Sequence, residues 1–319
     1  TRSRPVPVSK QIAPHRLEHE SPQVEVSIQL RSTSAEAAPE LLEQDGIRAA
    51  LMFSHDHHGR LRWTASFHTE AKMRSGVSIS PVLLGPYLMI GGAAREAVAA
   101  YDRATGEQVW RQDRPGHKRG KGAHTALVIG DRAVVLMSTG RSFTAEGEPG
   151  HLFPELGNYG PSPSVQGDLV AFNTGTGLLH LGSLRRSEGA AAWRWQAAVE
   201  DSRSPIISGD HVYQPSGGDL IAFAIANGRE SARIPTIGKW SSPALAGRAI
   251  VQFGKPEGGG GMVIQVVDVG DDGSLVERCR FATDIRPSAG GWDSGSSPVF
   301  DGDRLYFRGG EALWCLSCR

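Results

Sequence analysis

The feature that most constrains the fold is a short pattern that recurs six times along the chain. A Ser-Pro-like pair is followed by three mostly apolar or small residues and then by Gly, so that Gly always stands four residues after the Pro position. The copies are Ser80-Pro81 with Gly85, Thr125-Ala126 with Gly130, Ser162-Pro163 with Gly167, Ser204-Pro205 with Gly209, Ser242-Pro243 with Gly247, and Ser297-Pro298 with Gly302. Successive copies are 45, 37, 42, 38 and 55 residues apart, a spacing typical of a repeated supersecondary unit.

Each copy opens a unit that is typical of four short antiparallel strands. An apolar run with period-two alternation follows the Gly, as in Tyr87-Leu88-Met89-Ile90, and a second apolar run comes later, as in Leu220-Ile221-Ala222-Phe223. Asn227-Gly228 and Asp272-Gly273 then supply tight hairpin turns. Because a four-stranded meander cannot bury both of its faces alone, copies packed face to face around an axis are favoured. We therefore predict an all-β fold, a β-propeller of four-stranded blades.

Six clear copies and one partial copy predict about seven blades, within a range of six to eight. The partial copy spans residues 46–67 and looks like the back half of a blade. Val24–Leu30 alternates cleanly but has no blade of its own, and the last copy ends at Arg319, just after its third strand. We predict that Val24–Leu30 is the outer strand of the last blade and closes the ring, because this would pair an exposed strand edge. The predicted domains are a polar N-terminal arm over residues 1–23 and a single propeller domain over residues 24–319.

The segment Ala100-Tyr101-Asp102-Arg103-Ala104-Thr105-Gly106-Glu107-Gln108-Val109-Trp110 carries a family signature. It resembles A-x-D-x-x-T-G-x-x-x-W, the PQQ-like repeat of the quinoprotein-dehydrogenase-like and BamB-like propellers. The resemblance covers roughly residues 46 to 319 and implies the propeller fold. The signature also has a structural explanation. Asp102 and Thr105 can bond turn backbone, Gly106 supplies a left-handed residue, and Trp110 packs between blades, so we interpret the segment as a blade-docking device.

The resemblance bears on cofactors as well. In the quinone-using members, PQQ sits over the propeller axis with Ca²⁺ held by carboxylate and amide side chains, and a disulfide between adjacent cysteines flanks the ring system. This sequence has no Cys-Cys pair, and no Asp or Glu matches the cofactor signature. We therefore expect no cofactor, neither PQQ nor Ca²⁺, and we disfavour PQQ-dependent dehydrogenase activity.

The residues just before each inner strand are expected to rim the central channel and are candidates for ligand binding. Trp240 and Trp292 precede the repeat in consecutive copies, and an aromatic pair beside cations could hold a peptide, a sugar or an anion. In the alternative reading these side chains plug the channel or pack between blades. The candidates are Arg74, His124, Tyr159, Arg203, Lys239, Trp240, Trp292 and Asp293.

A candidate metal site is the run Ser54-His55-Asp56-His57-His58. On an extended segment His55 and His57 share one face, and two imidazoles with the Asp56 carboxylate could hold Zn²⁺ or Cu²⁺. His58 falls in the turn. Because this position matches the exposed turn of other blades, an empty site is the alternative interpretation.

The three cysteines, Cys279, Cys315 and Cys318, cannot all pair within one chain. Cys315 and Cys318 form a C-x-x-C, but Arg319 follows instead of His, so this is not a c-type haem attachment motif. Buried structural thiols, or one disulfide that involves Cys279, are favoured over redox chemistry.

Net charge and targeting signals limit which partners and which location are expected. Lys plus Arg and Asp plus Glu are equal at 34 each, so no global field favours nucleic acid. No apolar run is long enough to span a bilayer. Because the chain starts at Thr1, we expect a trimmed product, and relatives of this type favour a periplasmic or exported location over a cytoplasmic one.

Three functional hypotheses follow from the sequence. The first is a non-catalytic interaction or scaffold module that binds a protein, a peptide or a small ligand through loops and the axial funnel. The second is an enzyme, either a divergent quinoprotein or a metal-dependent one that uses the His cluster. The third is a recognition domain within a longer chain or a larger assembly.

Overall fold

The computed structural model describes eighteen stretches of the chain, and their regular structure consists of strands alone, with no helix among them. These stretches are residues 24–27, 48–55, 61–69, 82–91, 98–112, 121–122, 124–129, 132–137, 139–153, 159–174, 177–185, 190–200, 203–237, 241–254, 261–285, 298–301, 304–309 and 312–318. The all-β prediction is confirmed for this part of the chain. The predicted arm over residues 1–23 lies outside it.

The chain divides into two compact units, one of residues 40–233 and 271–274 and the other of residues 1–39, 234–270 and 275–319. Each is described here by itself. That residues 24–319 make a single domain stays a prediction.

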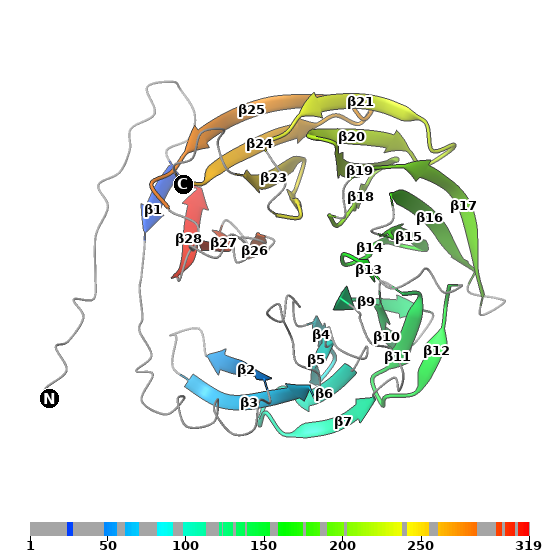
Figure 1. The fold of residues 1–319 in the computed structure, drawn as a ribbon, viewed down its shortest axis with the longest axis vertical. Helices are drawn as coiled ribbons and strands as arrows, with labels where there is room; N and C mark the ends of the chain where they lie inside the picture. Colours follow the sequence, from blue (N-terminus) through cyan, green and yellow to red (C-terminus); the bar gives the residue numbers. More distant parts are fainter. Residues whose placement is uncertain are drawn as a thin grey trace, which may run out of the picture. The chain divides into compact units, whose positions relative to one another are not determined.

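The larger unit contains four successive four-stranded antiparallel sheets. Each sheet runs as a meander, with the first strand on the inner side of the arc and the fourth outside (Figure 1). The first two sheets are β4 (Val82–Leu84), β5 (Tyr87–Gly91), β6 (Val98–Asp102) and β7 (Gln108–Gln112), then β9 (His124–Ile129), β10 (Arg132–Met137), β11 (Arg141–Thr144) and β12 (Pro149–His151). The next two are β14 (Ser164–Gln166), β15 (Leu169–Asn173), β16 (Leu178–Arg185) and β17 (Ala190–Ala198), then β18 (Ile206–Ser208), β19 (His211–Ser216), β20 (Asp219–Ala224) and β21 (Glu230–Pro235).

Two further strand pairs belong to the larger unit. β2 (Arg48–His55) and β3 (Leu61–Thr69) form an antiparallel hairpin, and the two-residue strands β8 (Lys121–Gly122) and β13 (Tyr159–Gly160) pair in parallel. The hairpin is the segment that the sequence indicates as the back half of a blade.

The smaller unit contains two four-stranded sheets. One is β22 (Ala244–Ala246), β23 (Ala249–Gly254), β24 (Val263–Val269) and β25 (Leu275–Ala282). The other is β26 (Val299–Asp301), β27 (Arg304–Gly309) and β28 (Ala312–Cys318), completed by β1 (Val24–Ser27) from the other end of the chain.

The described residues thus form six four-stranded blades, and the prediction of seven is not supported. The partial copy counted toward seven contributes only the two strands of the β2–β3 hairpin. Val24–Ser27 does pair with β28 as the predicted fourth strand, with Val24 opposite Cys318 and Ser27 opposite Cys315. Closure of a ring by this strand is not supported, because strand pairing within one blade does not establish a ring.

The fixed position of Gly in the repeat has a conformational reason. Gly85, Gly167, Gly209 and Gly247 connect the first strand of a blade to the second, and their φ angles lie between 57° and 58°. Residues with a Cβ atom are strained in this left-handed region, so a two-residue hairpin selects Gly there.

The core lies between the faces of neighbouring sheets. Leu179 and Leu181 of β16 are fully buried against Val212 of β19 and Ile221 of β20. In the smaller unit, Phe253 of β23 packs against Phe307 of β27, with ring centroids 4.6 Å apart. Within each unit, described blades therefore bury faces against neighbouring blades, as the meander argument requires.

The family signature proves to be a docking device between blades. The Trp110 indole N–H of β7 donates to the Ala145 carbonyl in the turn of the following blade at 2.7 Å. The same contact joins Trp63 to the Arg103 carbonyl at 3.0 Å, and Trp195 to the Ile225 carbonyl at 2.9 Å. The signature tryptophan, Trp110, therefore contacts the turn of the next blade. The turn that precedes Trp110 in the signature is in turn contacted by Trp63 of the preceding strand pair.

The turn is shaped to accept the indole ring. Asp102 Oδ1 accepts hydrogen bonds from the backbone N–H groups of Ala104 and Thr105, both at 2.8 Å, which fixes the turn. Gly106 has φ +78°, and a Cβ atom on it would lie 2.6 Å from the Trp63 ring. Glycine is thus required twice, by the backbone conformation and by the ring that lies on it.

A β-bulge aims the tryptophan. In β17, Trp195 pairs with Leu181 and Trp193 pairs with Gly182, so Arg194 is an extra residue. Two tryptophans that a regular strand would place on one face therefore contact different neighbours. Trp195 lies on the Gly228 turn of the next blade, and Trp193 lies 4.8 Å from the Phe153 ring of the preceding one.

One interface uses a different side chain. Ala232 stands four residues after Gly228, the spacing that separates Gly106 from Trp110. The turn that contains Gly273 is contacted instead by the buried imidazole of His211 in β19. A Cβ atom on Gly273 would lie 2.3 Å from His211 Nε2.

Two glycine variants separate the conformational cost from the docking contact. Gly209→Ala is expected to lower the free energy of unfolding by about 1–2 kcal/mol, the cost of a left-handed L-residue, since nothing lies within 4 Å of its new methyl group. Gly228→Ala adds overlap with the Trp195 ring, 2.7 Å away, and is expected to cost roughly 1–3 kcal/mol more. Urea unfolding of the two variants measures the difference. Equal losses would show that the indole contact contributes nothing.

Candidate functional site

Three of the predicted axial residues, His124, Tyr159 and Arg203, lie in the described part of the chain. Arg74, Lys239, Trp240, Trp292 and Asp293 lie outside the described residues. So do Asp56, His57 and His58, while His55 ends β2. The paired-tryptophan funnel and the His-rich metal site therefore stay predictions. Among the described residues, no three His, Cys, Asp or Glu side chains are grouped to hold a metal ion.

The backbone brings the segments around His124 and Tyr159 together. Tyr159 and Gly160 of β13 pair in parallel with Lys121 and Gly122 of β8, and His124 begins β9 two residues later. Because β8 and β13 each precede the inner strand of a blade, the approaches to two successive inner strands lie side by side. The pairing concerns the backbone alone, and the predicted rim of ligand-binding residues around a channel stays a prediction.

Arg203 is only 7% exposed, and it belongs to a buried polar cluster at the inner ends of β15 and β19. Its backbone carbonyl accepts hydrogen bonds from Asn173 Nδ2 and Gln214 Nε2, both at 3.2 Å. Gln214 Nε2 also donates to the Pro215 carbonyl at 2.7 Å. Amides from two neighbouring blades therefore meet at one carbonyl, which suits a strut between blades. Arg203 is therefore largely buried, and whether it binds a ligand stays a prediction.

Further polar contacts tie the inner strands together near this cluster. The Ile207 N–H of β18 donates to Ser164 Oγ of β14 at 3.0 Å, and Gln166 Nε2 donates to the Gly209 carbonyl at 3.4 Å. These two contacts serve cohesion, because each joins a residue of one blade to a residue of the next.

A second polar network, in the smaller unit, was missed by sequence reasoning. Buried Gln252 Nε2 donates to Gln265 Oε1 at 3.0 Å, and Gln265 Nε2 donates to Glu277 Oε2 at 2.6 Å. Arg280 Nη2 donates to the same carboxylate oxygen at 2.6 Å. Burial acts to raise the pKa of Glu277, but the hydrogen bonds from Arg280 and Gln265 outweigh it and hold that pKa below its usual value.

The signal that could have found these residues is an amide inside an apolar strand. Gln214 and Gln252 both stand five residues after the repeat Gly, in runs that are otherwise apolar or small, and both are buried. A buried amide must find hydrogen-bond partners, so its position in a core strand predicts a cross-strand contact, although not which one.

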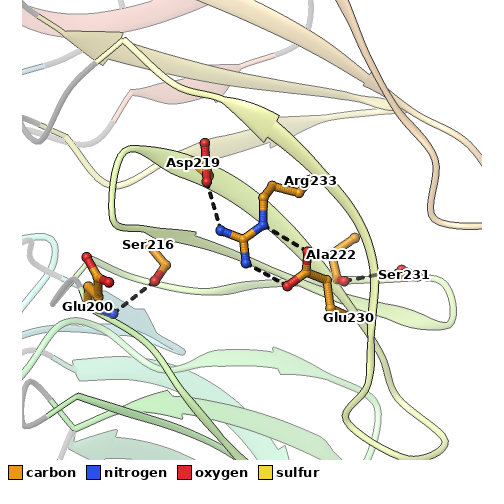
Figure 2. Close-up of polar contacts among 7 residues, drawn as sticks. All are labelled: Glu200, Ser216, Asp219, Ala222, Glu230, Ser231 and Arg233. Carbon is orange, nitrogen blue, oxygen red and sulfur yellow. Dashed lines mark hydrogen bonds and ion pairs between the residues drawn. The ribbon is translucent and has the colours of Figure 1, made fainter.

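An exposed charged cluster lies on the β20–β21 hairpin (Figure 2). Arg233 binds Glu230 through two hydrogen bonds of 2.7 and 2.8 Å and Asp219 through one of 2.8 Å. Nearby, the Glu200 N–H donates to Ser216 Oγ at 2.9 Å. The hydrogen bonds from Arg233 lower the pKa of Glu230 below its usual value, and the two carboxylates raise the pKa of Arg233. The cluster clamps two outer strands and leaves one net negative charge on the rim.

A family model described as outer membrane protein assembly factor BamB matches residues 53–317. The chain belongs to this family. The match includes the six described blades except for the β1 strand and Cys318, so this BamB-family propeller matches the family along nearly its whole described length.

Similarity to solved structures agrees with this membership. BamB from Moraxella catarrhalis is 14% identical, with a TM-score of 0.57 over 86% of this chain and 80% of that chain. A chain in the structure of a mitotic checkpoint complex is 10% identical, with a TM-score of 0.57 over 86% of each chain. The computationally designed Ika8 protein is 11% identical, with a TM-score of 0.54 over 94% of this chain and 85% of that chain. Identities this low show a shared fold alone, and no curated protein sequence matches the chain.

Replacing Arg203 is expected to change stability. In Arg203→Ala the buried side chain and its contacts are lost, so the free energy of unfolding should fall by about 2 kcal/mol or more. Arg194→Ala, at the exposed bulge of β17, is the control and should stay within about 0.5 kcal/mol of wild type. Urea denaturation measures both. Equal stability of the two variants would show that the buried side chain of Arg203 does not stabilise the fold.

Acid should weaken the clamp on the β20–β21 hairpin. Because the pKa of Glu230 is lower in the folded state, its contribution is fully present above the unfolded carboxyl pKa, about 4.3, and is lost as pH falls through the folded value. The exposed pair should contribute less than about 1 kcal/mol. Carbon-detected NMR titration of Glu230 should show its pKa rising in Arg233→Gln and unchanged in Arg229→Gln, whose side chain is also exposed. A pKa insensitive to Arg233→Gln would contradict the assigned cause.

Proposed function

We propose that this BamB-family propeller is a non-catalytic scaffold that binds another protein, or a peptide or small ligand, through its loops and axial funnel. The observation that carries the proposal is the family match over residues 53–317, whose description is that of an assembly factor. BamB is described as acting in the assembly of outer membrane proteins, so a role within a larger assembly, in the periplasm or otherwise exported, is the favoured one. No described helix is long and apolar enough to cross a membrane.

The cohesion of the described blades supports this role. Trp63, Trp110 and Trp195 each dock one strand pair on the next turn, and the Arg203 carbonyl joins amides of two blades. A rigid frame of this kind can hold variable loops in fixed positions, which lowers the entropy lost when a partner binds. The described polar contacts between these blades serve the frame, and we assign recognition to the loops and the axial funnel.

The scaffold proposal predicts no quinoprotein chemistry. The purified protein, incubated with PQQ and Ca²⁺ and then desalted, should retain no quinone absorbance and should show no dye-linked oxidation of alcohols or sugars. A quinoprotein dehydrogenase reconstituted in parallel is the positive control. Stoichiometric retention of PQQ with turnover would overturn the proposal and support the enzyme hypothesis.

The partner should bind at the loops that precede the inner strands. Tagged protein recovered from envelope extracts of the native host should bring down the same partner proteins for wild type and for Val276→Ala, an exposed change on β25. Trp240→Ala and Trp292→Ala should lose those proteins while they keep the wild-type melting temperature. If the two tryptophan variants retain the partners and the β25 variant loses them, the funnel is not the binding surface.

A further inference from the structure

The turn at Asn227-Gly228 receives the docking ring of Trp195. The Trp195 indole N–H donates to the Ile225 carbonyl at 2.9 Å, and a Cβ atom on Gly228 would lie 2.7 Å from the ring. Gly228 has φ +70°, and its N–H donates to the Ala224 carbonyl at 2.8 Å. The place of Gly228 in the turn therefore sets the surface on which the ring lies.

The residue before the docking glycine decides which chemistry is open to such a turn. In the four described turns whose glycine lies against a ring of the preceding strands, this residue is Thr105, Glu146, Asn227 or Asp272. Only asparagine and aspartate have a side-chain carbon that the next backbone nitrogen can attack to close a five-membered ring. Glycine as the next residue favours the attack, because it has no side chain to shield its nitrogen.

The side chain of Asn227 is exposed and is held beside its own backbone. Asn227 Oδ1 accepts a hydrogen bond from the Arg229 N–H at 2.9 Å. This bond spans Gly228 and so keeps the carboxamide next to the nitrogen that would attack it. In the closed turn that nitrogen is engaged with Ala224, so attack follows a local opening of this exposed tip, which costs little free energy.

The turn at Asp272-Gly273 has the same hydrogen bond but a less reactive side chain. Asp272 Oδ1 accepts a hydrogen bond from the Ser274 N–H at 3.0 Å. Hydrogen bonds from Ser274 hold the pKa of Asp272 below its usual value, so its carboxylate is charged at neutral pH. A charged carboxylate resists attack by an amide nitrogen, whereas the neutral carboxamide of Asn227 does not. The Asp272 turn also shows that a negative charge is tolerated at this place.

We propose that Asn227 is a site of spontaneous deamidation, and that its conversion to isoaspartate weakens the docking of Trp195. The Gly228 nitrogen attacks Asn227 Cγ and forms a C–N bond, the bond from Cγ to the amide nitrogen breaks, and the displaced nitrogen leaves as ammonia with the Gly228 amide proton. One water molecule then opens the cyclic imide at either of its two carbonyls. Opening at one gives aspartate, and opening at the other gives isoaspartate, in which the main chain runs through Cβ and Cγ.

Isoaspartate alters the turn because it adds one atom to the main chain before Gly228. The added atom displaces Gly228 from the position in which it bonds to Ala224 and lies under the Trp195 ring. The aspartate product leaves the main chain unaltered and keeps an oxygen that can accept the Arg229 N–H. A chemical change at an exposed hairpin tip therefore acts on the contact between two blades.

Peptide mapping of aged protein tests the modification. The folded protein is kept in mildly alkaline buffer until a synthetic peptide with the sequence of this turn is fully converted. Electron-transfer fragmentation should then find isoaspartate at position 227, and Asn173, which is buried and donates to the Arg203 carbonyl at 3.2 Å, should remain an amide. Asn227→Thr, with the residue that the family signature has here, should stay unmodified. An Asn227 that is still wholly amide at that time would overturn the proposal.

Melting temperature tests the effect on docking. The isoaspartate form, separated from aged wild type, should melt roughly 2–4 °C below fresh protein, because the contact between blades is weakened. Fresh Asn227→Asp, which has the added charge but an unaltered main chain, should melt within about 1 °C of wild type. In Trp195→Ala, which has no ring to undock, the isoaspartate form should lose less than half as much. An isoaspartate form that melts like fresh protein, or an equal loss in Trp195→Ala, would contradict the link to docking.

Discussion

The fold of this chain depends on an indole ring that lies on a glycine turn of the neighbouring strand pair. The contact joins hydrophobic burial to one directed hydrogen bond, from Trp110 Nε1 to the Ala145 carbonyl and likewise at Trp63 and Trp195. A four-stranded meander has two apolar faces and cannot be stable alone. Whatever fixes one meander against the next therefore fixes the fold, and here the turn, the bulge and the ring act as one part.

The departures from this rule follow the same logic. Where the chain has Ala232 at the tryptophan spacing, His211 packs against Gly273 instead. The interface between blades is thus kept by different chemistry at different places, because the need to bury a blade face is the same at each of them.

The polar residues of the described blades also act chiefly in cohesion. Arg203, Asn173 and Gln214 meet at one carbonyl between blades, and Gln252, Gln265 and Glu277 run from the core to the surface of one sheet. A frame that uses its interior polar groups for cohesion is suited to hold loops still.

The sequence by itself determined the blade, its four strands and the docking signature, because these are local. A Gly at a fixed distance from a Ser-Pro pair sets a hairpin, and Asp102, Thr105 and Gly106 form their turn from neighbouring residues. It also indicated that Val24–Ser27 is a fourth strand, since a clean alternation with no blade of its own has to pair somewhere. The tertiary structure alone decided the rest. Six blades replaced seven because the described residues complete only two strands of the partial copy, and Arg203 is buried because exposure depends on the neighbouring blade. Spacing along the chain does not reveal which face of which blade a residue meets, so the contact of Trp195 with the Gly228 turn became visible only in the tertiary structure.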